Sequence, residues 1–182
     1  MTEKEIQQLV DRVKSGDKDA FGLIYEEFVD RLYRYVFFRV DSEDAEDLLE
    51  TVFVKAWENI GKYKATGDKF SSWLFRIAHN LVVDHYRLNH SIEAITEEYQ
   101  EYRAEHHPGV SAERSLESNL LKKGLSALKD EYQQVLVLKY INDMPNSDVA
   151  AILGKSEGNL RVLQYRALRA LRGVLQDMGW SQ

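Results

Sequence analysis

The sequence contains no cysteine among its 182 residues, which excludes disulfide bonds, thiolate metal sites and thiol nucleophiles. Only two prolines and ten glycines are present, too few for a collagen-like or loop-dominated chain. No stretch approaches the roughly 18 uncharged apolar residues of a transmembrane helix, so membrane insertion is not expected. The N-terminal segment is charged throughout and has no secretory signal pattern. Together with the missing cysteines, this fits a cytoplasmic protein.

Charge is unevenly distributed along the chain, whose net charge is −6. Residues 1–61 carry 15 acidic and 8 basic side chains, and residues 91–144 carry 10 acidic and 6 basic ones. The balance reverses in residues 62–90, with 2 acidic and 5 basic, and in residues 145–182, with 3 acidic and 5 basic. Proteins that coat nucleic acid are usually basic overall. The pattern therefore predicts phosphate contacts at two local sites only, with the acidic parts facing another partner.

Apolar residues recur at three- and four-residue steps along most of the chain, which predicts helices, and no segment alternates as a strand would. The predicted helices cover residues 4–14, 18–40, 42–60, 70–88, 147–153 and 156–178, with further helical periodicity over 116–141. The periodicity lapses near residues 89–111. We therefore expect an all-α protein of two helical domains, residues 1–90 and 113–178. A flexible acidic linker, residues 91–112, would let them act as separately placed units.

Residues 147–172 have the pattern of a helix-turn-helix: a short helix, a turn with glycine and a longer basic helix. Gly154 suits the left-handed position that ends the first helix, and Ser156 is the predicted cap of the second. The predicted buried stripe of the second helix is Leu160, Leu163, Ala167, Leu168 and Leu171.

In such a motif the first turns of the second helix enter the major groove of DNA. The side chains expected on that exposed face are Lys155, Glu157, Asn159, Arg161, Gln164, Tyr165 and Arg166. Asn and Gln can pair with adenine, and Arg can pair with guanine or phosphate. The alternative is a plain amphipathic helix with a solvated arginine face. The glycine turn, the cap and the basic stripe together favour DNA contact.

Residues 43–60 form a predicted acidic helix that also carries apolar side chains, with Ser42 as its predicted N-cap. Phosphate would repel Asp44, Glu46, Asp47 and Glu50, so a protein with a basic surface is the better partner. Taken alone, however, this segment is better explained as a core helix with a solvated acidic face.

Residues 62–87 interleave basic and aromatic side chains, a composition that suits single-stranded nucleic acid. We expect Tyr63, Arg76, His79 and Asn80 to be exposed, whereas Phe70 and Trp73 are more simply explained as core residues. Arg76, His79, Asn80 and Arg87 share one helical face and could act together.

The order of these parts closely resembles the extracytoplasmic-function (group 4) sigma factors of bacterial RNA polymerase. Residues 44–60 resemble the region 2 segment that docks on the clamp helices of the largest polymerase subunit. Residues 70–87 resemble the region 2 helix that recognises and opens the −10 element. Residues 128–172 resemble region 4, which recognises the −35 element and contacts the flap of the second-largest subunit.

The resemblance implies roles for individual residues and partners. The polymerase-docking set is Asp44, Glu46, Asp47, Leu48, Glu50, Phe53 and Trp57. The set facing the unwound −10 strand is Tyr63 and Lys64 in the loop 62–69, then Arg76, His79, Asn80 and Arg87. The −35 set is the exposed face of the helix-turn-helix given above. Core polymerase, promoter DNA and a cognate anti-sigma factor are the expected partners, and no cofactor, metal or catalytic residue is expected.

Two other classes of function were weighed against this one. A two-domain helix-turn-helix transcription regulator with an N-terminal sensor would share the C-terminal motif and would not bind core polymerase. An enzyme is disfavoured, because the sequence has no HExxH motif and no phosphate-binding glycine loop. His79, His85 and His90 are five or six residues apart and so do not share one helical face.

Overall fold

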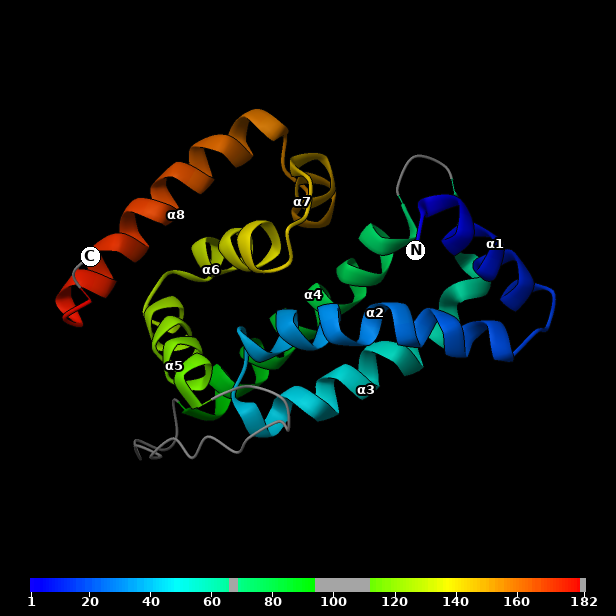
Figure 1. The fold of residues 1–182 in the computed structure, drawn as a ribbon, viewed down its shortest axis with the longest axis horizontal. Coiled ribbons are helices and arrows are strands. Elements are labelled where there is room, and N and C mark those ends of the chain that lie inside the picture. Colours follow the sequence, from blue (N-terminus) through cyan, green and yellow to red (C-terminus); the bar gives the residue numbers. More distant parts are fainter. Residues whose placement is uncertain (66–68, 94–111, 181–182) are drawn as a thin grey trace.

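The computed structural model describes residues 1–65, 69–93 and 112–180, and every regular element in those ranges is helical (Figure 1). The first half contains α1 (Glu3–Lys14), α2 (Asp19–Phe37), α3 (Ser42–Asn59), the 3-10 turn η1 (Ile60–Lys62) and α4 (Phe70–Glu93). The second half contains α5 (Ala112–Ser126), α6 (Asp130–Leu136), the π-helical turn η2 (Val137–Ile141), α7 (Asn146–Leu153) and α8 (Glu157–Asp177). The all-α expectation is confirmed. Most of the predicted linker, residues 94–111, lies outside the described residues.

Helices α1 to α4 form an N-terminal bundle around an aromatic and aliphatic core. Phe28 and Leu32 on α2 are fully buried against Phe70 and Leu74 on α4, and the rings of Phe28 and Phe70 lie 6.0 Å apart. The bundle begins with a capping box in which Thr2 and Glu5 satisfy each other's backbone N–H groups. This core therefore fixes the position of α4, which carries the basic and aromatic segment.

Helices α5 to α8 form a C-terminal domain in which α8 packs against α5, α6 and α7. The predicted glycine turn and N-cap of the helix-turn-helix are confirmed. Gly154 ends α7 with a φ of 62°, a left-handed conformation that glycine adopts without strain. The Ser156 side chain accepts a hydrogen bond from the Asn159 backbone N–H and so caps α8.

Several predicted boundaries and burial assignments differ from the structure. Asp41, not Ser42, occupies the N-cap position of α3. Helix α4 continues to Glu93, past the predicted end at Leu88, because no glycine or proline interrupts residues 89–93. Leu168 is exposed, since it lies about 100° around α8 from the buried Ala167.

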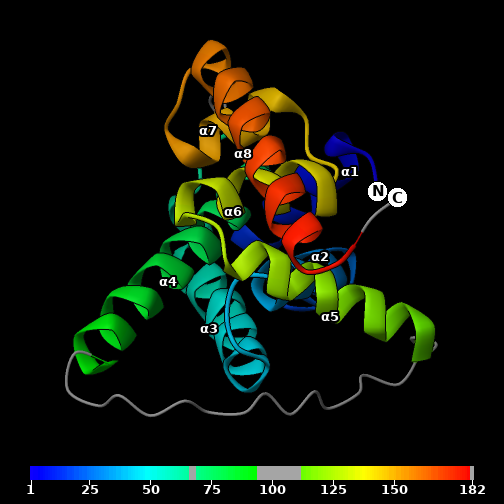
Figure 2. The same ribbon diagram turned by 90° about the vertical axis from the view of Figure 1, so that its left-hand side faces the viewer.

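The two halves lie against each other, which differs from the expectation of separately placed units. Helix α7 contacts α4, and η2 contacts α2, so the C-terminal domain sits on the N-terminal bundle (Figures 1 and 2). Charged side chains from both halves meet across this contact, which the spacing along the sequence could not show. Within the described ranges, none of the helices has the length and hydrophobicity needed to cross a bilayer.

Candidate nucleic-acid and protein interfaces

The start of α8 presents an exposed polar and basic face. Lys155, Glu157, Asn159 and Arg161 are all exposed there. Further along the same face, the predicted residues Tyr165 and Arg166 are also exposed. The Arg161 guanidinium lies 3.9 Å from the Glu157 carboxylate, and a surface pair of this kind is weak enough for DNA to displace. This face has the polarity and the helix placement needed to enter a major groove.

Gln164 does not belong to that exposed face, and its predicted exposure is wrong. It is 9% exposed, and its amide Nε2 donates a hydrogen bond to Asn146 Oδ1 on α7 at 2.9 Å. Positions 160, 163, 164 and 167 follow the three- and four-residue steps of the buried side of α8. The same spacing from Leu160 was visible in the sequence and could have identified Gln164 as a contact between the two helices of the motif.

The loop before α4 and the exposed side of α4 form what we name the strand surface: Lys64, Lys69, Arg76, Asn80 and Arg87. Lys64, Asn80 and Arg87 are exposed, and Arg76 is half-buried. Lys69, the last residue of the loop 62–69, is exposed as well. Cations and an amide along one helix provide a track for a phosphate backbone.

Tyr63 is not part of the strand surface, and its predicted exposure is also wrong. It is 5% exposed, and its ring lies 5.3 Å from Phe70 and 5.4 Å from Trp73. Lys14 on α1 donates to the Tyr63 carbonyl at 2.6 Å. Tyr63 therefore anchors the loop to the bundle through packing. The core assignment of Phe70 is confirmed, and Trp73 is half-buried.

His79 is half-buried, and the Tyr35 hydroxyl lies 3.2 Å from its Nδ1 atom. Burial lowers the pKa of His79, the positive charge of Arg39 lowers it further, and Asp130 partly opposes both. Burial also raises the pKa of Tyr35 to about 12. The imidazole is therefore predominantly neutral at pH 7, and it adds polarity but little positive charge to the strand surface.

Two cations of the strand surface are engaged by α7. Lys69 Nζ lies 3.0 Å from Asp148 Oδ2, and Arg76 Nη2 donates to the Ala151 carbonyl at 3.2 Å. Both acceptors belong to the first helix of the helix-turn-helix. The predicted single-strand contacts and the DNA-binding motif are therefore brought together in this structure.

Helix α3 carries a separate acidic face. Glu46, Asp47 and Glu50 are exposed, and Asp44 lies 3.4 Å from the His85 imidazole on α4. Leu48 is half-buried and packs against the bundle core. The acidic side chains are thus held on a helix whose other face is anchored in the core.

Exposed apolar side chains border this acidic face. Trp57 is 42% exposed, and its ring packs edge-on against Phe21 at 5.0 Å. Phe53 is buried, with its ring 4.5 Å from that of the exposed Tyr25. Leu23 and Val54 are exposed as well, and the sequence pattern alone does not predict that they or Tyr25 lie at the surface. Exposed apolar side chains beside a group of acidic side chains are typical of a surface that docks a protein with basic groups.

Among the residues whose positions the structure gives, no group of three His, Asp or Glu side chains is arranged to hold a metal ion.

Comparison with known proteins agrees with this division into two parts. The family model of sigma-70 region 2 matches residues 24–91, and that of sigma-70 region 4 matches residues 118–171. The ECF RNA polymerase sigma factor SigW of Bacillus subtilis is 33% identical, with 97% of this chain and all of SigW covered. BldN of Streptomyces coelicolor, also an ECF sigma factor, is 34% identical over 94% of this chain, which spans 66% of BldN.

The solved structure of CnrH in complex with the cytosolic domain of CnrY is also similar. It superimposes with a TM-score of 0.75 at 25% identity, covering 95% of this chain and 98% of CnrH. The match extends over both halves of the fold, and the full-length relation to SigW supports the same assignment. The chain belongs to the extracytoplasmic-function sigma factors of the sigma-70 family.

Proposed function

We propose that this sigma factor binds core RNA polymerase through the N-terminal bundle and directs it to promoters through the strand surface and the start of α8. The observation that carries the proposal is the separation of three chemically distinct surfaces on one chain. An acidic and apolar face lies on α3, cations and an amide lie along α4, and an exposed basic face lies on α8. The chain forms no covalent bond, and polymerase performs the chemistry.

The −35 contact is assigned to the exposed start of α8. Lys155, Asn159 and Arg161 have the donors and acceptors for base edges and phosphates, while the buried Gln164 supports α8 from below. Glu157, Tyr165 and Arg166 complete the face that the DNA would contact. A good bidentate contact between a side chain and a base is worth about 1–3 kcal/mol of discrimination.

The −10 contact is assigned to the strand surface. Opening DNA costs a few kcal/mol for each base step that is unstacked, and contacts to unpaired bases return about 1–3 kcal/mol per base. Lys64, Lys69, Arg76 and Arg87 offer positive charge to the displaced backbone, and Asn80 offers hydrogen bonds to a base.

The polymerase contact is assigned to α3 and its apolar border. Glu46, Asp47 and Glu50 would attract a basic helix pair, and Trp57 would serve as the central apolar anchor. Asp44, Leu48 and Phe53 are more buried, and they support this face by fixing α3 on the bundle. CnrH is bound by the cytosolic domain of another protein, CnrY. We expect this chain to be bound by an anti-sigma factor, which would cover the same surfaces.

Run-off transcription with purified core polymerase tests the proposal. A random promoter library transcribed with and without this protein should yield an enriched pair of −35 and −10 elements. Arg161→Ala should lower transcription from the enriched promoter about 5- to 150-fold, the equivalent of about 1–3 kcal/mol. It should leave polymerase binding unchanged.

The matched control is Arg172→Ala, which removes an exposed arginine from the far end of the same helix and should be nearly neutral. If transcription from the enriched promoter falls equally in both variants, Arg161 has no specific role at the −35 element. Failure of the wild-type protein to co-purify with core polymerase, combined with tight specific binding to duplex DNA alone, would replace the proposal with a helix-turn-helix regulator.

A further inference from the structure

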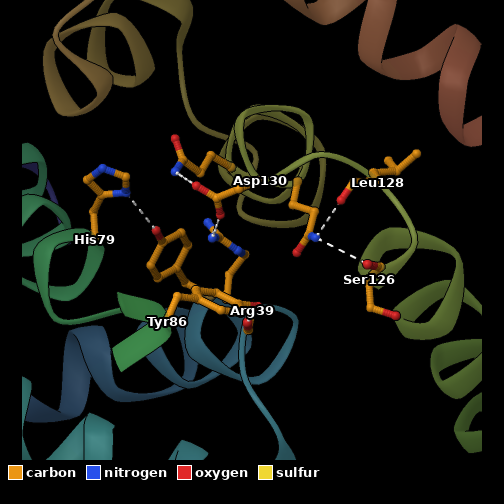
Figure 3. Close-up of polar contacts among 9 residues, drawn as sticks. Arg39, His79, Tyr86, Ser126, Leu128 and Asp130 are labelled. Atoms are coloured by element: carbon orange, nitrogen blue, oxygen red, sulfur yellow. Dashed lines mark hydrogen bonds and ion pairs between the residues drawn. The ribbon is translucent and has the colours of Figure 1, made fainter. Parts of the chain in front are cut away.

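The imidazole of His79 on α4 is held at one of its two ring nitrogens by a buried tyrosine of α2. Tyr35 is fully buried, and its hydroxyl lies 3.2 Å from His79 Nδ1, a contact drawn as a dashed line in Figure 3. The Tyr35 ring packs edge-on against Phe75 at 5.9 Å, which fixes the position of the hydroxyl. The orientation of the His79 ring is therefore set by a residue from another helix.

The direction of this hydrogen bond follows from what the tyrosine requires. Burial raises the pKa of Tyr35 to about 12, so the hydroxyl keeps its proton at pH 7, and a buried O–H group needs an acceptor. Within the part of the chain that the structure describes, that acceptor is His79 Nδ1. If Nδ1 itself carried a proton, it would donate to the tyrosine oxygen and leave the buried O–H unpaired, which is unfavourable. Tyr35 is therefore assigned as the donor and Nδ1 as the acceptor.

A neutral imidazole that accepts a hydrogen bond at Nδ1 carries its proton on Nε2. Burial lowers the pKa of His79 and the charge of Arg39 lowers it further, while Asp130 partly opposes both, so the ring is predominantly neutral at pH 7. Arg39 and Asp130 belong to the same group of polar side chains (Figure 3). The second edge of the ring therefore presents an N–H donor that has no charge.

This donor lies on the side of α4 that is assigned to the DNA strand. Positions 76, 79 and 80 share one face of the helix, where Arg76 and His79 are half-buried and Asn80 is exposed. In residues 1–65, 69–93 and 112–180, Nε2 of His79 has no hydrogen-bond partner, and it is not enclosed away from solvent. The guanidinium of Arg76 is best matched by a phosphate, whereas an uncharged N–H suits a neutral acceptor.

We propose that Tyr35 is a positioning residue that fixes His79 in the Nε2–H tautomer, and that this N–H donates to an acceptor atom of an unpaired base in the −10 strand. The tautomer is a property of the chain alone, whereas the base contact rests on the proposed function. Carbonyl oxygens and purine ring nitrogens are such acceptors, while the exocyclic amino groups of adenine and cytosine are donors and would be disfavoured. His79 then contributes base preference beside a cation that holds the backbone.

The tautomer is measured by nitrogen-15 NMR on the full chain labelled at histidine. Long-range proton–nitrogen correlations at pH 7 distinguish a protonated ring nitrogen from an unprotonated one, and the signals lost in His79→Gln identify those of His79. The wild type should show a protonated Nε2 and an unprotonated Nδ1. Tyr35→Phe keeps the ring beside Phe75 and removes the donor, so the two tautomers should exchange and the two nitrogen shifts should move towards each other.

The matched control is Tyr33→Phe, which alters a half-buried tyrosine of the same helix and leaves the contact with His79 intact. It should keep the wild-type nitrogen shifts. A protonated Nδ1 in the neutral wild-type ring would overturn the assigned tautomer. Wild-type shifts retained in Tyr35→Phe would overturn the positioning role of Tyr35. Circular dichroism checks that the variants remain equally helical.

The base contact is measured with holoenzyme assembled on core polymerase and a fluorescent single-stranded oligonucleotide that carries the −10 sequence enriched in the run-off assay. Each −10 base is replaced in turn, and the affinities give the preference at each position. His79→Leu removes the donor and should weaken the preference at one position by about 2- to 10-fold, as expected for one hydrogen bond. His79→Gln places an amide N–H near the same point and should retain most of that preference. Tyr35→Phe should lie between these two variants.

The outcomes separate the base contact from the proposed function. Wild-type preferences at every position in His79→Leu would overturn the base contact. An equal loss of affinity for all sequences would also overturn it, because the donor would then face a phosphate. If the wild-type holoenzyme does not bind the oligonucleotide, the proposed function and the base contact both fail, while the NMR spectra still decide the tautomer.

Discussion

Replacement of Gln164 by alanine separates a DNA-contacting role from a supporting one. The truncation removes the 2.9 Å hydrogen bond to Asn146, worth about 0.5–1.5 kcal/mol net, since a half-buried Asn146 can recover part of it from water. It also removes one buried methylene beyond Cβ, worth about 0.8 kcal/mol. The free energy of unfolding of the helix-turn-helix should therefore fall by about 1–2 kcal/mol. Gln164→Met keeps the methylenes and should cost only the hydrogen bond, about 1 kcal/mol.

Amide hydrogen exchange along α8, measured on the full chain, gives this local free energy of opening. A double-mutant cycle with Asn146→Ala should show a coupling of about 0.5–1.5 kcal/mol. Transcription from a promoter library should fall for all −35 sequences alike, with the preferred bases unchanged. The reasoning is refuted if Gln164→Ala alters the preferred −35 base while exchange along α8 stays at the wild-type rate.

Other predictions concern pH and glycine. Burial lowers the pKa of His79 below 6.5 in the folded protein, so during acidification the unfolded chain binds a proton at this site before the folded chain does. The free energy of unfolding should therefore fall as the pH drops from 6.5 towards the folded-state pKa. In urea titrations at several pH values, the free energy of unfolding of His79→Gln should fall less with decreasing pH than that of the wild type. An equal fall in the two proteins would contradict this role of His79. Gly173→Ala should stabilise α8 by about 1 kcal/mol, because its new Cβ meets open space. Gly124→Ala should lack that gain, because its Cβ would lie 2.8 Å from Leu175, and equal urea midpoints for the two variants would contradict the packing argument.

Features governed by local chemistry were predictable from the sequence. Gly154 and Ser156 were assigned from the backbone conformation and the capping geometry that their side chains permit, and the structure has both. The core role of Phe70 followed from its helical spacing. For Gly154 and Ser156 the deciding interaction lies within a few residues along the chain, whereas for Phe70 the helical spacing marks the buried face without naming its distant partner Phe28.

Features governed by distant contacts were not predictable. Tyr63 was assigned to the surface from its basic neighbours, but its burial depends on Phe70, Trp73 and a lysine of α1. Asp148 was part of the helix-turn-helix pattern, and nothing in its neighbourhood indicated a partner 79 residues away. Such pairings depend on how whole domains meet, and a periodic pattern carries no information about that.

The length of α4 has a mechanical consequence. Its 24 residues form one continuous rod of about 36 Å, which starts beside the loop that carries Lys69 and ends at Glu93 (Figure 2). A tilt of about 10° around its first turn would move the far end by about 6 Å, a displacement that follows from the rise per residue. A nucleotide strand that reorients the front of this rod would therefore also displace its far end at Glu93.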